Sequence, residues 1–172
     1  MSFEKELSLF IDAFRDNKNS TTFLEDNAEL INSLVKNLRC ETSFKDLSES
    51  NEDLFYSLVE SGALPVLVKA ICESYHNYYE LIDQQAELVT YIRKTNIIDI
   101  DSLNYATVSL GNVKLYLKEL KKKPGSVLQQ LYAERSKYKT RQEWIQEDQL
   151  SFFAAFEMNL VSKIEAKFKR HH

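Results

Sequence analysis

The sequence predicts an all-α protein, an elongated antiparallel bundle of long helices with a smaller N-terminal helical layer. Three observations support this fold class. Glycine and proline are scarce, at 3 and 2 of 172 residues, whereas all-β and nucleotide-binding α/β folds need many turn glycines. Apolar residues recur at helical spacing along most of the chain. Hydrophobic residues make up 44% and charged residues 28%, a balance typical of a globular protein with a packed core.

Residues 1–62 are expected to form the N-terminal layer. A first helix begins after Ser2 and runs to about residue 15, with an apolar face at helical spacing. A second helix follows Thr22, because Glu25 three residues later completes a capping box. After a polar connection, a short helix covers residues 52–61. Together these helices predict a compact layer.

Residues 63–172 are expected to form the long-helix bundle, continuous with the layer as one structural unit. Gly62 suits the C-terminus of the short helix, and Pro65 suits the first turn of the next one. Heptad spacing over residues 64–94 predicts one long helix with a coiled-coil seam. Gln85 is a polar position on that seam, and one such residue can fix register or oligomeric state. We therefore expect this helix to share an interface.

Two further long segments complete the predicted bundle. Apolar residues three and four apart predict a helix over residues 102–122, with Asp101 or Ser102 as its N-cap. Gly111 inside it favours a close approach to another helix over a hinge, and Pro124 and Gly125 end the helix or kink it sharply. Residues 126–169 contain neither glycine nor proline. They are expected to form either one helix or two joined near residues 147–149.

Charge is unevenly distributed along the chain. The net charge is −4, but residues 1–101 hold 9 Lys or Arg against 19 Asp or Glu, and residues 102–172 hold 13 against 7. The segment 114–141 alone carries nine basic and two acidic residues. Its predicted basic surface comprises Lys114, Lys118, Lys121, Lys122, Lys123, Arg135, Lys137, Lys139 and Arg141.

Four interpretations of this basic segment stay open. Its cations with interleaved tyrosines suit nucleic-acid phosphates and stacked bases. Lysines near anionic lipid add about 1 kcal/mol each, so a membrane surface is an alternative. An acidic protein partner is a third. A face that is solvated, or paired within the molecule, is the fourth.

The leading functional hypothesis is a non-enzymatic interaction protein: an adaptor, assembly subunit, scaffold or regulator that binds another protein or itself. Long apolar stripes exceed what one small bundle covers, and exposed apolar surface marks association sites. The predicted contact residues are Phe152, Phe153, Phe156, Trp144 and Gln85. Aromatic residues at helical spacing also fill cores, so a core role for this aromatic cluster stays open.

The sequence carries no recognisable catalytic or cofactor motif. It lacks a Gly-rich phosphate loop, a Cys-x-x-Cys pair and a nucleophile elbow. Glu73 and His76 match the Glu-x-x-His pattern of di-iron bundles, but that site needs a second copy and no histidine remains for it outside the terminal pair. We therefore expect no enzyme activity, cofactor or metal. Two widely spaced cysteines and a charged N-terminus without a signal peptide predict an intracellular, cytoplasmic protein, with a nuclear location left open.

Two resemblances add to this interpretation. The segment 53–71, with the core LVESGALPVL, resembles the junction between two helices of an armadillo repeat, and covers about a tenth of the chain. The resemblance implies an armadillo-like N-terminal layer and the protein-binding scaffold role of that family. Helices as long as those expected downstream depart from it. Residues 66–170 loosely resemble the long-helix hairpins of crescent-shaped, membrane-bending dimers, on helix length and basic charge alone.

Overall fold

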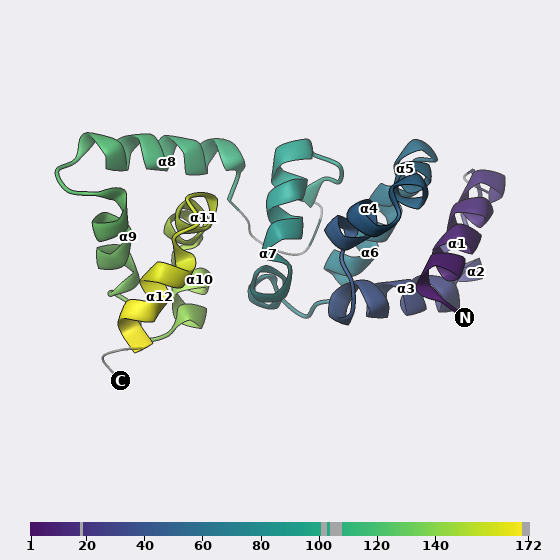
Figure 1. Ribbon diagram of the computed structural model, residues 1–172, viewed down its shortest axis with the longest axis horizontal. Coiled ribbons are helices and arrows are strands. Elements are labelled where there is room, and N and C mark those ends of the chain that lie inside the picture. The colour runs from purple at the N-terminus through teal and green to yellow at the C-terminus, as the bar shows by residue number, and fades with distance from the viewer. Residues whose placement is uncertain (18, 101–102, 104–107, 170–172) are drawn as a thin grey trace. The chain divides into compact units, whose positions relative to one another are not determined.

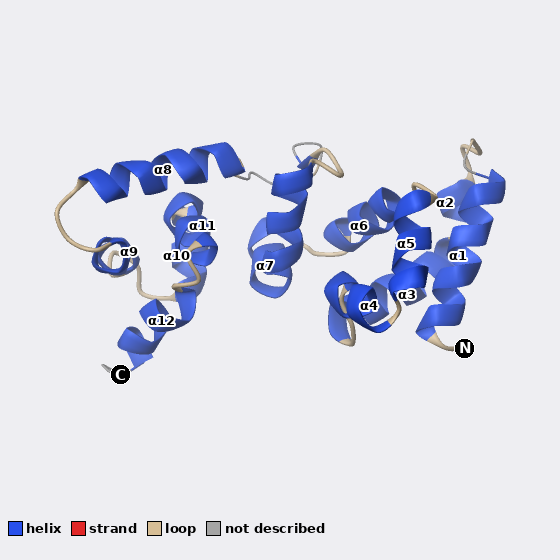
Figure 2. Cartoon of the chain, turned by 45° about the horizontal axis from the view of Figure 1, so that its top comes forward, coloured by secondary structure: helices blue, strands red, loops and turns tan. Residues whose placement is uncertain are grey.

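The computed structural model describes residues 1–17, 19–100, 103 and 108–169. These residues form twelve α-helices and no strand (Figures 1 and 2), which confirms the all-α prediction. The chain divides into two compact units. One comprises Met1–His76 with Ile97–Asp99, and the other Asn77–Asn96 with Ile100–His172. The boundary expected at residue 62 stays a prediction.

The first unit is built around α3. The helices are α1 (Phe3–Asn17), α2 (Phe23–Asp26), α3 (Ala28–Cys40), α4 (Phe44–Ser50), α5 (Glu52–Glu60) and α6 (Leu64–Glu73). Helix α3 packs against α1, α2 and α6, while α5 packs against α1 and α4. Four of the thirteen α3 residues are buried and recur at helical spacing: Ile31, Leu34, Val35 and Leu38. The amphipathic pattern therefore forms the core here as expected.

The corner between α5 and α6 matches the prediction. Gly62 has a φ of 83°, a left-handed conformation that glycine adopts without steric cost. Pro65 lies in the first turn of α6, where its missing amide hydrogen is not needed. The two helices are bent by 93°. Ser2 also caps α1, since its hydroxyl accepts a hydrogen bond from the Lys5 amide at 3.2 Å.

The helix expected after Thr22 is interrupted after one turn. Thr22 makes no capping hydrogen bond, so the predicted capping box is wrong. Its hydroxyl instead donates to the Asp26 carboxylate at 2.9 Å. Helix α2 then ends at Asp26. Its C-cap is Asn27, whose side-chain amide donates to the Phe23 carbonyl at 2.9 Å. Short polar side chains of this kind compete with the backbone for hydrogen bonds and end helices.

The second unit is arranged around α11. Its helices are α7 (Tyr78–Thr95), α8 (Leu110–Lys122), α9 (Val127–Arg135), α10 (Arg141–Glu147), α11 (Gln149–Glu157) and α12 (Val161–Lys169). Helix α11 packs against α8, α9, α10 and α12, and α7 packs against α8 and α10 (Figure 1). Five consecutive α11 residues, Ser151 to Ala155, are buried. A helix that is apolar on all sides occupies the centre of a core.

The long helix expected over residues 64–94 is not continuous. Helix α6 ends at Glu73, and Asn77 caps α7 by accepting a hydrogen bond from the Glu80 amide at 2.9 Å. Gln85 then has non-helical backbone angles, with φ −131° and ψ 39°, so α7 is itself kinked. The predicted uninterrupted heptad seam is therefore wrong. Ser74 and Asn77 favour a break that the apolar spacing alone does not reveal.

The helix expected over residues 102–122 starts later. Its first residue is Leu110, and Ser109 caps it by accepting a hydrogen bond from the Asn112 amide at 3.1 Å. The expected caps at residues 101 and 102 lie outside the described residues. Gly111 is exposed, and among the described residues a Cβ there would meet only the Ser109 hydroxyl, at 3.9 Å. The predicted close helix approach at Gly111 is therefore wrong.

Residues 126–169 form four helices in place of one or two. Thr140 and Asp148 begin α10 and α11 by accepting hydrogen bonds from the Glu143 amide at 3.0 Å and the Ser151 amide at 3.2 Å. Asn159 lies two residues after the end of α11 and has a left-handed φ of 56°, a conformation that asparagine tolerates better than most residues. Polar caps break the helices without glycine or proline, so the long-helix bundle is not confirmed.

Candidate interaction surface on helix α8

Helix α8 carries the densest basic surface among the described residues. One side packs into the second unit, where Val113 and Leu120 are buried. The last residue of α8 is Lys122 and Lys123 is its C-cap. Gly125 then turns the chain with a φ of 91°. Ser126 opens α9 through a full capping box with Gln129. Ser109 therefore caps the start of α8, Lys123 ends it, and the side opposite Val113 and Leu120 is exposed.

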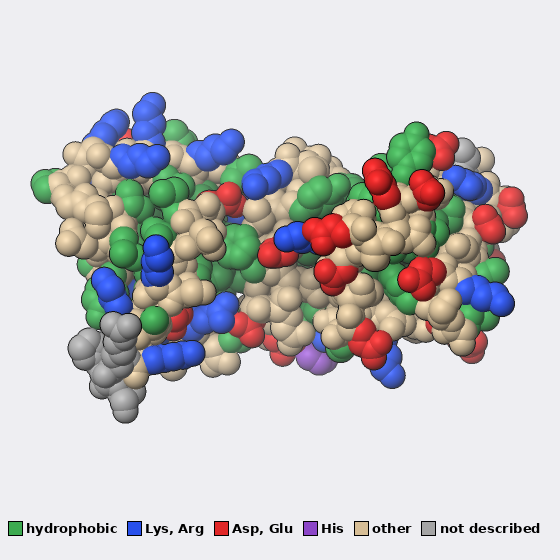
Figure 3. All heavy atoms as spheres, viewed as in Figure 1, with side chains coloured by type: hydrophobic (Ala, Val, Ile, Leu, Met, Phe, Trp, Pro, Cys, Tyr) green, Lys and Arg blue, Asp and Glu red, His purple; other side chains and the backbone are tan. Residues whose placement is uncertain are grey.

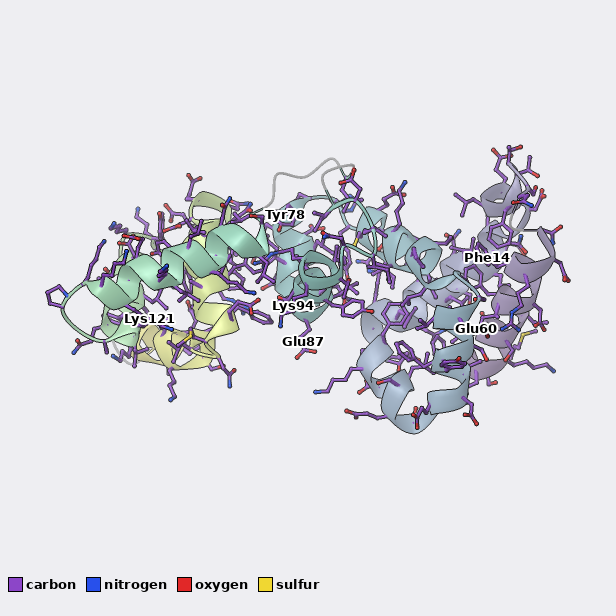
Figure 4. All side chains as sticks on the ribbon, turned by 90° about the horizontal axis from the view of Figure 1, so that it is seen from above. Phe14, Glu60, Tyr78, Glu87, Lys94 and Lys121 are labelled. Carbon is purple, nitrogen blue, oxygen red and sulfur yellow. The ribbon has the colours of Figure 1, made fainter. Side chains whose placement is uncertain are left out.

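The free face of α8 combines positive charge with one apolar residue. Its exposed side chains include Lys114, Leu115, Lys118, Glu119, Lys121 and Lys122, with Lys123 at the end. Leu115 is 62% exposed. Residues three, four and seven apart share one side of a helix, so Lys118 and Lys122 lie on the same side as Leu115, and Lys114 is its neighbour in the sequence. Figure 3 shows blue side chains gathered over α8, and Figure 4 labels Lys121 on it.

Little within the described chain neutralises this face. Of its lysines, Lys122 alone forms an ion pair among the described residues, to Glu119 at 3.2 Å. Both partners are about two-thirds exposed, and exposed pairs contribute little to stability. The remaining lysines keep their charges available to an anionic partner.

Tyr116 lies beside this face but contributes no charge to it. Partial burial raises its pKa well above the ordinary value, and the nearby carboxylates of Glu134 and Asp148 raise it further. The phenol is therefore neutral at physiological pH.

Arg135 does not belong to the basic surface predicted from the sequence. It is 3% exposed, and its Nε donates to the Glu165 carboxylate at 2.6 Å. Its Nη1 donates to the Tyr138 carbonyl at 2.9 Å, and its guanidinium carbon lies 4.2 Å from the Phe168 ring centroid. Arg135 thus joins α9 to α12 inside the unit. A buried charge with this many partners is structural.

The other predicted basic residues are divided in role. Lys137 pairs with Glu134 at 2.8 Å, and that hydrogen bond raises the pKa of Lys137. Arg141 lies 3.7 Å from Asp83 of α7 and is half-buried. Lys139 is exposed. The nine residues expected to form one surface are therefore spread over separate environments, and five of them lie on α8 or at its end.

The predicted aromatic contact cluster lies in the core. Trp144, Phe152 and Phe153 are fully buried, and Phe156 is half-buried. The Trp144 and Phe152 ring centroids are 5.3 Å apart in an edge-to-face arrangement. The Trp144 Nε1 donates to the Ser151 hydroxyl at 2.7 Å. The three buried rings therefore fill the core of the second unit, the alternative that the sequence left open, and their role as partner contacts stays a prediction.

Gln85 is half-buried and lies at the kink of α7. A helix with non-helical angles at this residue does not carry a continuous seam through it. The structure therefore gives Gln85 no position in a coiled coil.

Arg93, a buried cation in α7, is not among the functional residues predicted from the sequence. It is 7% exposed, and its guanidinium carbon lies 4.0 Å from the Phe153 ring centroid. Its three side-chain nitrogens have no hydrogen-bond partner among the described residues. Burial lowers the pKa of Arg93, while Tyr78 and Glu157 counteract that shift. Its position four residues after the buried Val89, on the inward side of the helix, is the sequence signal that would have identified it.

No group of three or more His, Cys, Asp or Glu side chains in the described part of the chain has the proximity to hold a metal ion. No single described helix is long and apolar enough to cross a bilayer, and α5 with α6 reach that length only jointly, across their bend.

Comparison with known proteins does not assign a family. No family model matches the chain, and neither a curated protein nor a solved structure matches it.

Proposed function

We propose that this protein is a non-enzymatic interaction protein, an adaptor, assembly subunit or regulator, that binds an acidic surface of another protein through the exposed face of α8. One observation carries the proposal: several exposed lysines lie around the exposed Leu115 on a helix that Ser109 caps. Lysines steer an acidic partner towards this face and select against basic ones. An exposed apolar side chain within a charged face adds a contact that excludes water.

Nucleic acid is a less suitable ligand for this face. Binding of single strands relies on exposed aromatic rings that stack on bases. Tyr116 and Tyr138 are half-buried, and the Tyr132 ring stacks on Phe168 with centroids 4.9 Å apart. The tyrosines of the basic segment therefore serve packing, and only the attraction between lysines and phosphates would support binding of nucleic acid.

An anionic membrane is also less suitable. An interfacial helix inserts its apolar side into the headgroup region, but the apolar side of α8 packs within the unit through Val113 and Leu120. Leu115 is the one large apolar side chain exposed on this helix. Lipid attraction would then depend on lysine charge without insertion.

Three defined ligands separate these alternatives. We would measure binding to a glutamate-rich helical peptide, a single-stranded oligonucleotide and phosphatidylserine vesicles, each at rising salt. The test variant is Lys118→Glu with Lys122→Glu, and the matched control is Lys139→Glu with Lys163→Glu, which changes the charge equally at exposed sites outside α8.

The proposal expects peptide binding that falls about tenfold or more in the α8 variant, since 1.4 kcal/mol corresponds to a factor of ten. The control should bind as the natural sequence does. Loss of peptide binding in both variants to the same extent contradicts the proposal. Preferential binding of vesicles or oligonucleotide would transfer support to the corresponding alternative.

A further inference from the structure

The exposed face of α5 has the opposite charge to α8. Its residues Glu52, Asp53, Tyr56, Val59 and Glu60 are all exposed. Tyr56, Val59 and Glu60 lie four, seven and eight residues after Glu52 and share one side of the helix with it, and Asp53 borders that side. Tyr56 is 66% exposed and Val59 46%. The α5 face therefore presents two apolar side chains in the middle, with carboxylates towards both ends.

Neighbouring elements extend this negative surface. Helix α4 packs against α5 and exposes Asp46 and Glu49, together with Lys45. Arg15 of α1 pairs with Glu60 at 3.2 Å and neutralises part of that end. Figure 3 shows red side chains gathered over α4 and α5, and Figure 4 labels Glu60 at the end of α5. The acidic end around Glu52 and Asp53 is unpaired among the described residues.

We propose that the α5 face is the docking surface for α8 of a second copy of this chain. The proposal rests on the proposed function, because it names the acidic protein surface that α8 binds. Each face has what the other lacks: carboxylates around Tyr56 and Val59 on α5, and lysines around Leu115 on α8. Apolar side chains meet at the centre and opposite charges meet around them, which is the usual arrangement of a protein interface.

Charge disfavours pairing of either face with the same face of a second copy. Pairing α5 with α5, or α8 with α8, would place like charges opposite each other, which costs several kcal/mol in unfavourable cases. The unit Met1–His76 with Ile97–Asp99 holds 7 Lys or Arg against 15 Asp or Glu, whereas the rest of the chain holds 15 against 11. Made twice about a two-fold axis, the α5–α8 contact closes a dimer; made head to tail, it continues from copy to copy unless the rotation closes a ring.

The association should be weak and sensitive to salt. One face from each of two short helices buries less than the roughly 1,600 Å² of a standard interface. Exposed charges at its rim are screened within about 10 Å at 0.1 M salt. We therefore expect reversible assembly that grows with protein concentration at low salt and dissociates as salt rises.

Sedimentation velocity of the full chain tests this proposal with two charge-reversed variants. In the first, Lys118→Glu and Lys122→Glu make the α8 face acidic. In the second, Glu52→Lys and Asp53→Lys make the α5 face basic. Each variant alone opposes like charges and should associate about tenfold more weakly than the natural sequence.

Mixing the two variants is the decisive measurement. The natural α5 face of the first variant then meets the natural α8 face of the second, and the two reversed faces are also complementary. The mixture, and a chain with all four substitutions, should regain the association that each variant lost. Lys139→Glu with Lys163→Glu, which changes the charge of exposed sites elsewhere in the same unit, should associate like the natural sequence.

Two results would overturn the proposal. The first is a natural chain that stays monomeric at low salt and high micromolar concentration. The second is association that both variants retain, or that their mixture fails to restore. If the chain is monomeric but α8 charge reversal still abolishes binding of the glutamate-rich peptide, the second-copy proposal fails while the proposed function stands. If peptide binding is also unaffected by that reversal, both fail.

Discussion

Cys72 shows how burial sets the chemistry of a single residue. Both cysteines are free, Cys40 exposed and Cys72 fully buried. Desolvation is the largest cause that raises the pKa of the Cys72 thiol to about 12, and the charge of Glu73 adds to it. Only the thiolate is nucleophilic, so Cys72 is inert in the folded chain near neutral pH.

The raised pKa of Cys72 predicts a loss of stability in alkaline solution. The thiol has a pKa of about 8.5 in the unfolded chain and about 12 when folded, so the unfolded state releases its proton first as pH rises. The contribution of the protonated thiol to the free energy of unfolding is fully present below pH about 8.5 and is lost towards pH 12, at up to about 1.4 kcal/mol per pH unit. Urea unfolding at pH 8 and pH 10 measures this loss.

The matched variants for this experiment are Cys72→Ala and Cys40→Ala. Between the two pH values, Cys72→Ala should lose about 2 kcal/mol less than the natural sequence. Cys40→Ala should follow the natural sequence, because its side chain is exposed. If all three chains lost the same free energy of unfolding between pH 8 and pH 10, the raised pKa of Cys72 would be contradicted.

Ser151 illustrates a buried hydrogen bond that the core requires. Ser151→Ala removes the acceptor of the Trp144 Nε1 and leaves a buried donor unsatisfied, at a cost of about 1–3 kcal/mol. Trp144 is the single tryptophan, so its fluorescence during urea unfolding reports on the second unit. Ser162→Ala, at an exposed position of α12, should change stability by less than about 0.5 kcal/mol. Similar effects of both substitutions would argue against the hydrogen bond.

At the scale of helices, the two glycines Gly62 and Gly111 predict opposite effects. A Cβ at Gly62 would lie 3.7 Å from Phe14 Cε1, an ordinary contact (Figure 4 labels Phe14). Gly62→Ala should therefore cost about 1–2 kcal/mol through the left-handed backbone alone. Gly111→Ala should stabilise α8 by about 0.5–1 kcal/mol, because alanine reduces the entropy lost on helix formation. Thermal unfolding followed by circular dichroism measures both.

The outcome at Gly111 distinguishes two descriptions of α8. Stabilisation by alanine agrees with an exposed glycine near a helix start. Destabilisation would instead support the close helix contact that the sequence pattern predicts. A neutral Gly62→Ala would contradict the left-handed corner between α5 and α6.

At the scale of the whole chain, charge is segregated by unit. The calculated isoelectric point is about 5.5, and a uniformly acidic protein would not bind a cation exchanger at pH 7. Because the basic residues gather on α8, we predict retention at low salt on both cation- and anion-exchange resins. Lys118→Glu with Lys122→Glu should elute from the cation exchanger at clearly lower salt. The pair Lys139→Glu and Lys163→Glu should shift elution less, and an equal shift would contradict a localised basic surface.

The sequence by itself determined the helical class and the α5–α6 corner. Scarce glycine and proline, periodic apolar residues, and the Gly62 and Pro65 pair are local signals, and the structure confirms what they predict. The cap at Thr140 is also local, since its hydroxyl accepts from the Glu143 amide. Thr140 and Glu143 have the Thr-x-x-Glu spacing of a helix start, so this break in residues 126–169 has a local signal, although the same spacing at Thr22 makes no cap.

Tertiary packing alone decided which charged and aromatic residues reach the surface. Phe152 and Phe153 have the same local pattern whether they face a partner or a core, and only the helices around α11 bury them. Arg135 is one of nine basic residues in its segment, yet Glu165, thirty positions away, holds it inside the unit. Burial is a property of contacts between distant residues, and the spacing of one segment carries no information about what packs against it.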